Sequence, residues 1–233
     1  MKTLGLLGGM SWESTVPYYK IINRTVNQYL GGLHSAEILL YSVDFQQIEE
    51  MQVAGRWSEA AEVLTSGACR LEKAGADLLV LCTNTMHKVA SEIEAATSIP
   101  FLHIADATGD AIRYRGLSVV GLLGTRFTME ETFYRHRLED RYGLHVVTPE
   151  ESDRGLVHRV IYDELCRGQI LEESRRQYRK ILHRLAASGA EGVILGCTEI
   201  SLLVRTEDSP VPLFDTTEIH ARRAAELALE PDS

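Results

Sequence analysis

LEKAGADLLVLCTNT, residues 71–85, and LAASGAEGVILGCTE, residues 185–199, are two versions of one segment. Each has a Gly-Ala pair, then an apolar run, then a short polar motif. A short apolar run bounded by turn residues is typical of a buried strand. The alignment places Thr83 opposite Cys197, at an offset of 114 residues. The two segments therefore predict two equivalent strands, one followed by a hydroxyl group and the other by a thiol.

The repeat extends beyond this segment in both directions. LGLLGGMSWESTVPYY from Leu4 resembles VGLLGTRFTMEETFYR from Val120, and SIPFLHIADAT from Ser98 resembles SPVPLFDTTEI from Ser209. The offsets of these two blocks, 116 and 112 residues, stay close to 114. A period this long predicts two copies of one α/β unit and not a solenoid of short repeats.

Short apolar runs alternate with amphipathic stretches along the chain. The runs at 4–9, 37–43, 77–81, 118–124, 145–147 and 192–195 are predicted strands, and 57–73 and 172–187 are predicted helices. Apolar strands that alternate with helices indicate an α/β fold whose parallel sheets are covered on both faces. We place the domains at residues 1–110 and 111–213, and expect the helix within 214–233 to pack back on the first domain.

Polar residues follow several of these predicted strands. Ligands of parallel sheets bind beyond the carboxyl ends of the strands, which is where we expect Ser11, Asp44, Thr83, Thr125, Cys197 and Asp215. The glycine-rich loops after the first strand of each half open into helices, whose free N–H groups can bind an anion. The glycines can equally serve only to form turns. Their spacing does not favour a dinucleotide site, and neither a Walker lysine nor a Gly-x-Ser-x-Gly elbow is present.

Charge and hydropathy narrow the class of partner. The formal net charge of −9 argues against nucleic acid and anionic membranes. No apolar run is long enough to cross a bilayer, and residues 1–10 are too short and glycine-rich for a secretory leader. We therefore expect a cytoplasmic protein that binds a small molecule.

The four cysteines show neither zinc-site spacing nor the density of a disulfide scaffold. Cys69 and Cys166 lie in predicted helical stretches, where a free cysteine is usually a packing residue. Cys82 is out of phase with Cys197 in the repeat, so we expect it to be buried. Cys197 comes just before a predicted helix, whose dipole is expected to lower the pKa of the thiol. Cys197 is the candidate base of the chain, and a buried structural cysteine is the alternative.

The motifs GGMSWEST, LCTNTMH, LLGTRFTM and GCTEI give the whole chain a resemblance to the aspartate/glutamate racemase family. The resemblance implies two Rossmann-like domains related by a pseudo-twofold axis, with the active site in the cleft between them. It implies racemisation without pyridoxal phosphate or a metal, on an amino-acid substrate, by a homodimer. Each domain of the family ordinarily supplies one catalytic cysteine, one for each face of the substrate α-carbon.

The chain departs from the family at one of these cysteines. Cys197, Thr198 and Glu199 match the C-terminal motif, whereas the N-terminal Cys-Asn-Thr motif reads Thr83-Asn84-Thr85 here. A thiol forms a thiolate near neutral pH far more easily than a threonine hydroxyl forms an alkoxide. Cys197 is therefore predicted to remove the α-proton of L-aspartate or L-glutamate, and Thr83 to deliver a proton to the opposite face. D-amino acids are predicted to turn over poorly.

The other roles concern binding. The resemblance and the loop positions assign recognition of the carboxylate, and stabilisation of the charge that develops in the reaction, to Met10, Ser11, Asn84, Thr85, Thr125 and Thr198. Glu199 is expected to orient the thiol or to bind the substrate ammonium, with a structural helix-start carboxylate as the alternative. Gln47 follows Asp44 at the end of a predicted strand and is the candidate for the substrate side chain. The family resemblance implies a lysine for the second carboxylate, and Glu164 stands about where that lysine is expected. His87, four residues after Thr83, is either catalytic or structural.

Two other classes of function remain open from the sequence. A chain with one thiol instead of two can be a decarboxylase or a cis-trans isomerase of a dicarboxylate. It can also be an amino-acid sensor that kept the pocket and lost half of the chemistry. A substrate panel with malonates and maleate distinguishes the first class, and ligand binding without α-proton exchange distinguishes the second.

Overall fold

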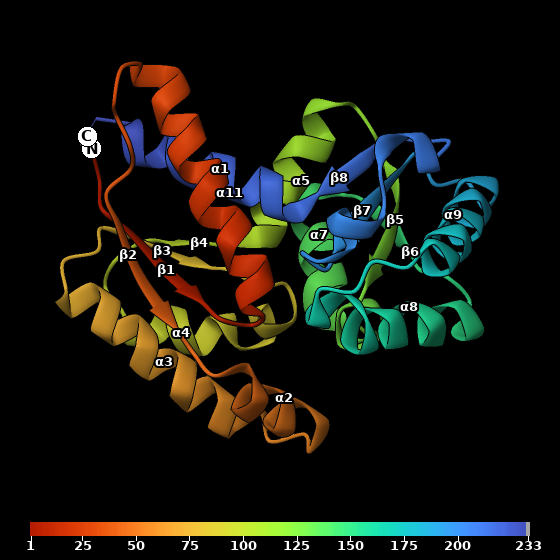
Figure 1. The fold of residues 1–233 in the computed structure, drawn as a ribbon, viewed down its shortest axis with the longest axis horizontal. Coiled ribbons are helices and arrows are strands. Elements are labelled where there is room, and N and C mark those ends of the chain that lie inside the picture. Colours follow the sequence, from red (N-terminus) through yellow and green to blue (C-terminus); the bar gives the residue numbers. More distant parts are fainter. Residues whose placement is uncertain (232–233) are drawn as a thin grey trace. The chain divides into compact units, whose positions relative to one another are not determined.

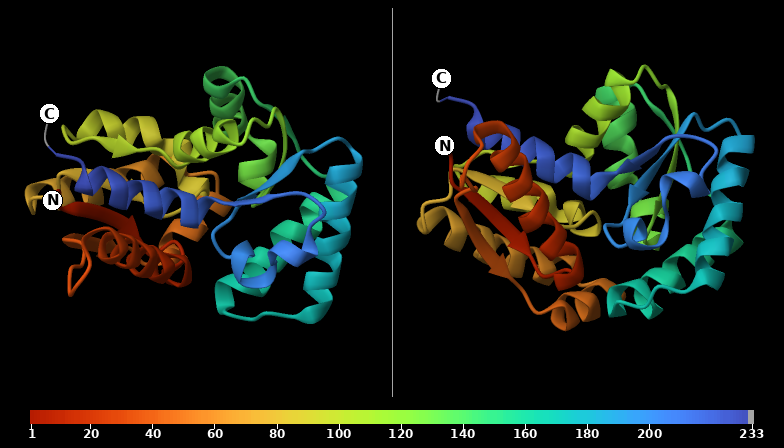
Figure 2. Two further views of the ribbon diagram at one scale, coloured as in Figure 1. Left: turned by 90° about the horizontal axis from the view of Figure 1, so that it is seen from above. Right: turned by 45° about the horizontal axis from the view of Figure 1, so that its top comes forward.

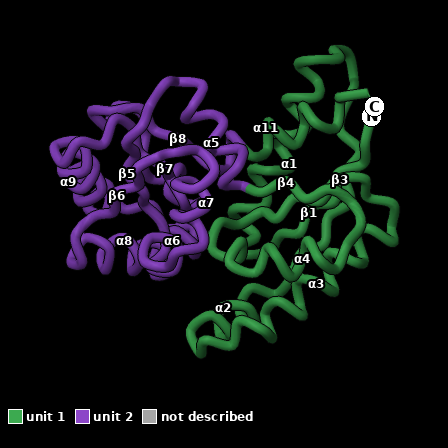
Figure 3. Tube along the Cα trace, turned by 180° about the vertical axis from the view of Figure 1, so that it is seen from behind, with its two compact units in different colours: residues 1–103, 220–233 green, residues 104–219 purple. Residues whose placement is uncertain are grey.

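The computed structural model describes residues 1–231 and divides them into two compact units. Unit 1 comprises residues 1–103 and the segment from His220 onward, and unit 2 comprises Ile104–Ile219 (Figure 3). The expected boundary at residues 110 and 111 falls inside α5 (Ile104–Tyr114), a helix that belongs wholly to unit 2. No helix of the described residues is long and apolar enough to cross a membrane.

Unit 1 is built on a four-stranded sheet with the strand order β2-β1-β3-β4. Its elements are β1 (Leu4–Gly8), α1 (Trp12–Leu30), β2 (Ile38–Ser42), α2 (Phe45–Val53), α3 (Trp57–Lys73), β3 (Leu78–Leu81), the 3₁₀ turn η1 (Thr85–Val89), α4 (Ala90–Ala96), β4 (Phe101–Leu102) and most of α11 (Thr216–Leu229). The strands pair in parallel.

Unit 2 repeats this topology with the order β6-β5-β7-β8, again in parallel. After α5 come β5 (Val119–Gly124), α6 (Arg126–Glu130), α7 (Thr132–Tyr142), β6 (His145–Val147), α8 (Glu151–Asp163), η2 (Leu165–Arg167), α9 (Glu172–Ala187), β7 (Gly192–Gly196), α10 (Ile200–Leu203), η3 (Thr206–Asp208) and β8 (Leu213–Asp215). The expected α/β fold with parallel sheets is confirmed, and so is the internal repeat.

Helices cover both faces of each sheet, as the apolar strands predicted. In unit 1, α1 and α11 pack on one face and α2, α3 and α4 on the other (Figures 1 and 2). In unit 2, α5 and α7 cover one face, and α8, α9 and α10 cover the other. Alternate residues of β1 follow this division, since Leu4 and Leu6 contact the α1 side and Leu7 the α3 side.

The last helix of each repeat packs in the other unit. The helix that follows β4 is α5, and it belongs to unit 2. The helix that follows β8 is α11, and its alanines pack with α1 in unit 1, at Ala221, Ala224, Ala225 and Ala228. Small side chains at this spacing allow α11 to lie close to the sheet and to α1.

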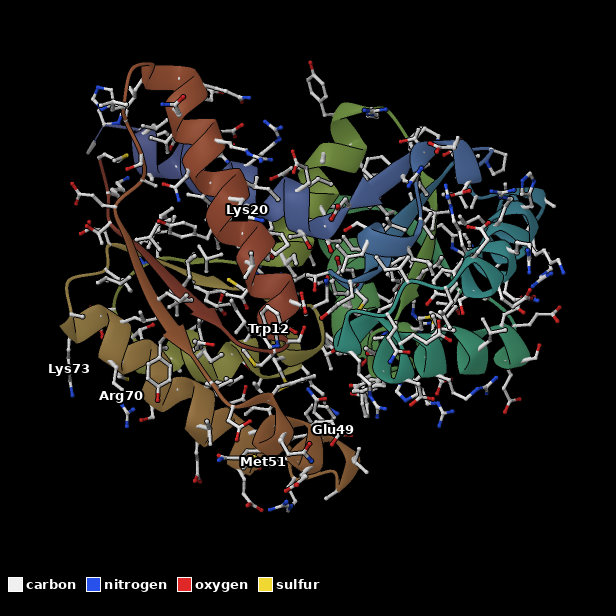
Figure 4. All side chains as sticks on the ribbon, viewed as in Figure 1. Trp12, Lys20, Glu49, Met51, Arg70 and Lys73 are labelled. Carbon is white, nitrogen blue, oxygen red and sulfur yellow. The ribbon has the colours of Figure 1, made fainter. Side chains whose placement is uncertain are left out.

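Helix α1 illustrates how the sequence pattern selects a buried face. Tyr18, Ile22 and Val26 recur at a helical spacing and are fully buried against the sheet. Trp12 and Lys20 lie on the exposed face, where Figure 4 labels them. Trp12 directly follows the loop that ends β1, so the buried face of α1 fixes where that loop sits.

Candidate functional site

The loop after β1 has a backbone that only glycine adopts easily. Gly9 has a φ of +93°, and a Cβ placed there would lie 2.4 Å from the carbonyl oxygen of Val43. The Gly9 N–H donates to Oγ1 of Thr15 at 2.8 Å, and the Thr15 hydroxyl donates to the carbonyl of Ser11 at 2.9 Å. These two bonds hold residues 9–11 against the first turn of α1.

The same bonds correct part of the anion-binding expectation. The N–H of Gly9 already has a partner in Thr15, so it is not open to a ligand. In unit 2, the N–H of Arg126 donates to Nδ1 of His158 at 3.2 Å, and the hydroxyl of Thr125 caps α6 by accepting from the N–H of Thr128 at 3.3 Å. A carboxylate can therefore use only part of each loop.

Thr83 lies at the carboxyl end of β3, in a short polar segment that is almost entirely buried. Thr83, Asn84 and Thr85 are 6%, 3% and 6% exposed. The N–H of Thr83 donates to the carbonyl of Leu81 at 2.9 Å, and the carbonyl of Thr83 lies 2.7 Å from Nδ1 of His87. The preceding Cys82 is fully buried, as predicted.

Cys197 lies at the carboxyl end of β7, and it and Thr198 both donate to the carboxylate of Glu199. Its thiol donates to Oε2 of Glu199 at 3.0 Å, and the hydroxyl of Thr198 donates to the same oxygen at 2.8 Å. Cys197, Thr198 and Glu199 are 7%, 6% and 3% exposed. A buried carboxylate that accepts two such bonds is suited to hold a thiol in one orientation.

The pKa expected for Cys197 is wrong in direction. Burial raises the pKa of the thiol, and the negative charge of Glu199 raises it further. The helix dipole does not offset these effects, because α10 has only four residues and begins three positions after the cysteine. Both effects favour the neutral thiol over the thiolate at Cys197.

The strand registers support the alignment of the two half-sites. Leu7 of β1 pairs with Leu81 of β3, and Leu123 of β5 pairs with Leu195 of β7. Thr83 and Cys197 each come two residues after the paired leucine of their strand. The two side chains therefore occupy equivalent positions, each at the carboxyl edge of its own sheet.

Other candidate residues lie at the same edges. Met10 and Ser11 are buried after β1, and Thr125 is buried after β5. Asp215 ends β8, accepts from the N–H groups of Thr217 and Glu218 at 2.9 and 3.3 Å, and has a pKa that burial raises. Gln47 is exposed on α2, three residues after the N-cap Asp44. Within each unit, the structure thus places the predicted residues around one sheet edge.

One further contact of Glu199 could not be predicted from the sequence. The thiol of Cys166, in η2, lies 3.7 Å from Oε1 of Glu199, so Cys166 is more than the packing residue that was expected. Burial and then the Glu199 charge raise the pKa of Cys166. Glu164, two residues earlier, accepts from the hydroxyl of Ser174 at 2.6 Å. The end of α8 brings both residues to this part of unit 2.

Comparison with known proteins identifies a matching family. The family model described as Asp/Glu/hydantoin racemase matches residues 7–224 of the chain. Among curated relatives, the broad-specificity amino-acid racemase of Bacillus subtilis is 25% identical over 226 residues, which cover 94% of this chain and 95% of the relative.

Solved structures agree over the full length. A Yersinia pestis protein assigned as an Asp/Glu racemase is 57% identical, with a TM-score of 0.92 and coverage of 99% of this chain and 100% of that one. An aspartate racemase homologue from Pyrococcus horikoshii is 35% identical, with a TM-score of 0.85 and the same coverage.

Proposed function

The chain belongs to the Asp/Glu/hydantoin racemase family and is a racemase, and we propose that it interconverts the L- and D-enantiomers of aspartate, of glutamate or of both. The observation that carries the proposal is the hydrogen bond of 3.0 Å from the Cys197 thiol to Glu199, at the position equivalent to Thr83. This hydrogen bond joins a nucleophilic sulfur to a proton acceptor in one repeat. The aligned position of the other repeat holds a hydroxyl group, which can donate a proton.

The proposed reaction starts with activation of the thiol. The Cys197 proton passes to Glu199 along their hydrogen bond, because a thiol with a raised pKa does not ionise by itself near neutral pH. The thiolate then removes the α-proton from one face of the L-amino acid. Glu199 thus acts on the thiol, and Cys197 acts on the substrate.

The second half of the reaction uses the other repeat. The carbanion that forms is stabilised as an enediolate-like anion by hydrogen-bond donors of the loops, with Asn84, Thr85 and the main-chain N–H of Thr198 as candidates, since the Thr198 hydroxyl donates to Glu199. Thr83 delivers the proton from its hydroxyl to the opposite face, and water restores that proton. The hydroxide that this water leaves takes the proton held by Glu199, so both half-sites return to their starting state. The reaction requires neither pyridoxal phosphate nor a metal, and it requires one substrate to reach Thr83 and Cys197 together.

A hydroxyl in place of a thiol limits the reverse direction. Thr83 donates a proton far more easily than it removes one, so the turnover number is expected to be low with D-substrates. The equilibrium constant between enantiomers is one, so kcat/KM is the same in both directions. The asymmetry is expected in kcat and KM separately, and not in the final ratio of enantiomers.

The binding roles of Met10, Ser11, Gln47 and Thr125 belong to the same proposal. Gln47 is the candidate for the substrate side chain, since an exposed amide on α2 can donate to a carboxylate. We also propose that the enzyme is a cytoplasmic homodimer, as the family resemblance implies. Sedimentation of the purified protein tests the oligomeric state.

The test follows the α-proton of L-aspartate, L-glutamate and both D-forms by proton NMR in D₂O, together with chiral analysis. Loss of the L-substrate signal with appearance of the D-enantiomer is the expected result. Cys197→Ala should abolish both the exchange of the α-proton and the inversion, and Thr83→Ala should abolish the inversion. Failure of the wild-type protein to exchange any of the four would overturn the proposed substrates.

The single thiol favours one other reaction class as the second candidate. A dicarboxylate decarboxylase or cis-trans isomerase needs Cys197 and no second base, and Thr83 is the observation in its favour. Turnover of substituted malonates or maleate, in the absence of amino-acid racemisation, would select it. Saturable binding of aspartate without any exchange would instead select a sensor.

A further inference from the structure

His87 links the Thr83 half-site to the interior of unit 1. It lies in η1, the 3₁₀ turn that starts two residues after Thr83, and the residue is 3% exposed. Nδ1 lies 2.7 Å from the carbonyl oxygen of Thr83, while the N–H of His87 donates to the carbonyl of Asn84 at 3.1 Å. Side chain and main chain of one residue thus hold two successive carbonyl groups of the motif.

The bond to Thr83 settles which ring nitrogen carries hydrogen. A carbonyl oxygen only accepts, so Nδ1 of His87 must be the donor. His87 therefore does not present a basic Nδ1 toward the motif. Its contact is with the Thr83 main chain, and the hydroxyl that would donate to the substrate belongs to the same residue.

The ring of His87 is held by a histidine cluster, which we define as His87, His103, His220, Phe101 and Tyr18. The His87 ring centroid lies 4.4 Å from that of His103, 5.5 Å from Phe101 and 6.0 Å from His220. The members come from α1, η1, the β4 region and α11, all in unit 1. Rings packed from four parts of the fold leave His87 little freedom to turn.

His220 anchors the far side of this cluster through two hydrogen bonds. Its Nε2 lies 2.9 Å from the carbonyl of Leu102, so Nε2 carries the hydrogen. Its Nδ1 then accepts from the Tyr18 hydroxyl at 2.8 Å. The chain of contacts runs from α1 and α11 through His220 and His87 to the carbonyl of Thr83.

We propose that His87 is a positioning residue that holds the Thr83 hydroxyl in line for proton delivery. The inference rests on the proposed function, because it assigns to Thr83 the second proton transfer. Proton transfer is sensitive to displacements of about 1 Å, which can lower a rate by about 10²-fold. Loss of the His87 bond should therefore slow inversion at Thr83 and leave proton removal at Cys197 largely intact.

The test needs a separate measure of proton removal at Cys197. In the 3-chloro derivative of the L-substrate, removal of the α-proton by the thiolate lets the electron pair form a Cα–Cβ double bond as chloride leaves. The resulting enamine tautomerises to an imine, which water hydrolyses to the keto acid and ammonium. Chloride release thus reports Cys197 without Thr83, whereas chiral analysis of the natural substrate reports both groups.

Three variants separate position from simple loss of a ring. His87→Asn places an amide N–H near the position of Nδ1, His87→Gln places one near Nε2, and His87→Leu has none. The expected result is inversion lowered at least 10-fold in His87→Gln and His87→Leu, with chloride release within about 3-fold of wild type. His87→Asn should retain both activities within about 3-fold. His183→Asn, at an exposed histidine of α9, is the control.

Each other outcome has a definite meaning. The inference would be overturned if the variants lost inversion and chloride release equally while circular dichroism showed wild-type secondary structure. That result would show a general structural role for His87. Unchanged inversion in His87→Gln would overturn it too. If His87→Leu does not fold, the Asn and Gln pair decides alone. A wild-type enzyme without racemisation would overturn the proposed function itself, which the wild-type measurement reveals before any variant is compared.

Discussion

Replacement of Glu199 by glutamine should make the Cys197 thiol more reactive and the enzyme less active. Glu199 raises the pKa of this buried thiol by its charge, and it accepts the thiol hydrogen bond at 3.0 Å. Glutamine keeps the size of the side chain and removes both the charge and most of the basicity. The two effects on Cys197 then act in opposite directions, which makes the variant informative.

The distance of 3.0 Å between Sγ and Oε2 determines the size of the first effect. Two unit charges at this separation repel by about 5.5 kcal/mol at an effective dielectric constant of ~20, and by about 1.4 kcal/mol in water. One pKa unit corresponds to about 1.4 kcal/mol. Glu199→Gln should therefore lower the pKa of the Cys197 thiol, which burial still keeps above its ordinary value.

Alkylation by iodoacetamide at pH 8, followed by peptide mapping, measures this shift at Cys197 alone. For each unit by which the pKa falls, the thiolate fraction rises about tenfold. The nucleophilicity of the thiolate falls about 3-fold over the same unit. The alkylation rate should therefore increase about 3-fold per unit. Glu207→Gln, an exposed carboxylate of the same unit, is the matched control and should leave the rate unchanged.

Turnover should fall in the same variant, by about 10²- to 10⁴-fold, because the thiol proton has lost its acceptor. Faster alkylation together with slower racemisation is the expected pair of results. Alkylation no faster than in wild type would refute the electrostatic reasoning. Racemisation near the wild-type rate would refute the role of Glu199 as proton acceptor and leave it an orienting residue.

Three further predictions concern single residues. Gly9→Ala should lower the free energy of unfolding more than Gly75→Ala. Both glycines have φ above +90°, but only at Gly9 would the added Cβ also meet a backbone oxygen. Urea unfolding should show a loss of about 1–2 kcal/mol for Gly75→Ala and at least twice that for Gly9→Ala. Burial lowers the pKa of His220 to about 4, so the unfolded chain binds this proton first as pH falls, and about 3 kcal/mol of stability should be lost between pH 6.5 and 4. In His220→Gln the overall stability falls, but pH-dependent unfolding should lack this component. Thr83→Cys should raise kcat for the D-substrate by tenfold or more in the chiral assay, and an unchanged kcat would contradict the proposed limit on the reverse reaction.

Much of the fold was predictable from local pattern alone. The helices 57–73 and 172–187 and the strand 145–147 have the bounds that the sequence predicted. This is possible because burial on two faces requires continuous apolar strands, and burial on one face requires helical spacing of apolar residues. The repeat alignment also agrees with the observed strand registers.

Local pattern misled where the environment of a side chain decides its chemistry. The sequence places Cys197 before a helix, which predicted a lowered pKa, whereas burial and Glu199 raise it. The helix is too short to compensate, and its length depends on packing that sequence spacing does not reveal. Cys166 reaches Glu199 because η2 packs beside α10 in the folded unit.

The sequence by itself determined the α/β class, the duplication and the exchange of a cysteine for Thr83, because strand periodicity, repeat spacing and residue identity are properties of the linear chain. The tertiary structure decided which groups share a proton and which carbonyl His87 holds. Those contacts join residues from different elements, among them Cys166 and Glu199, or Tyr18 and His220 across 202 positions. Hydrogen bonds and desolvation act through space over a few ångströms, so only the folded chain brings their partners within range.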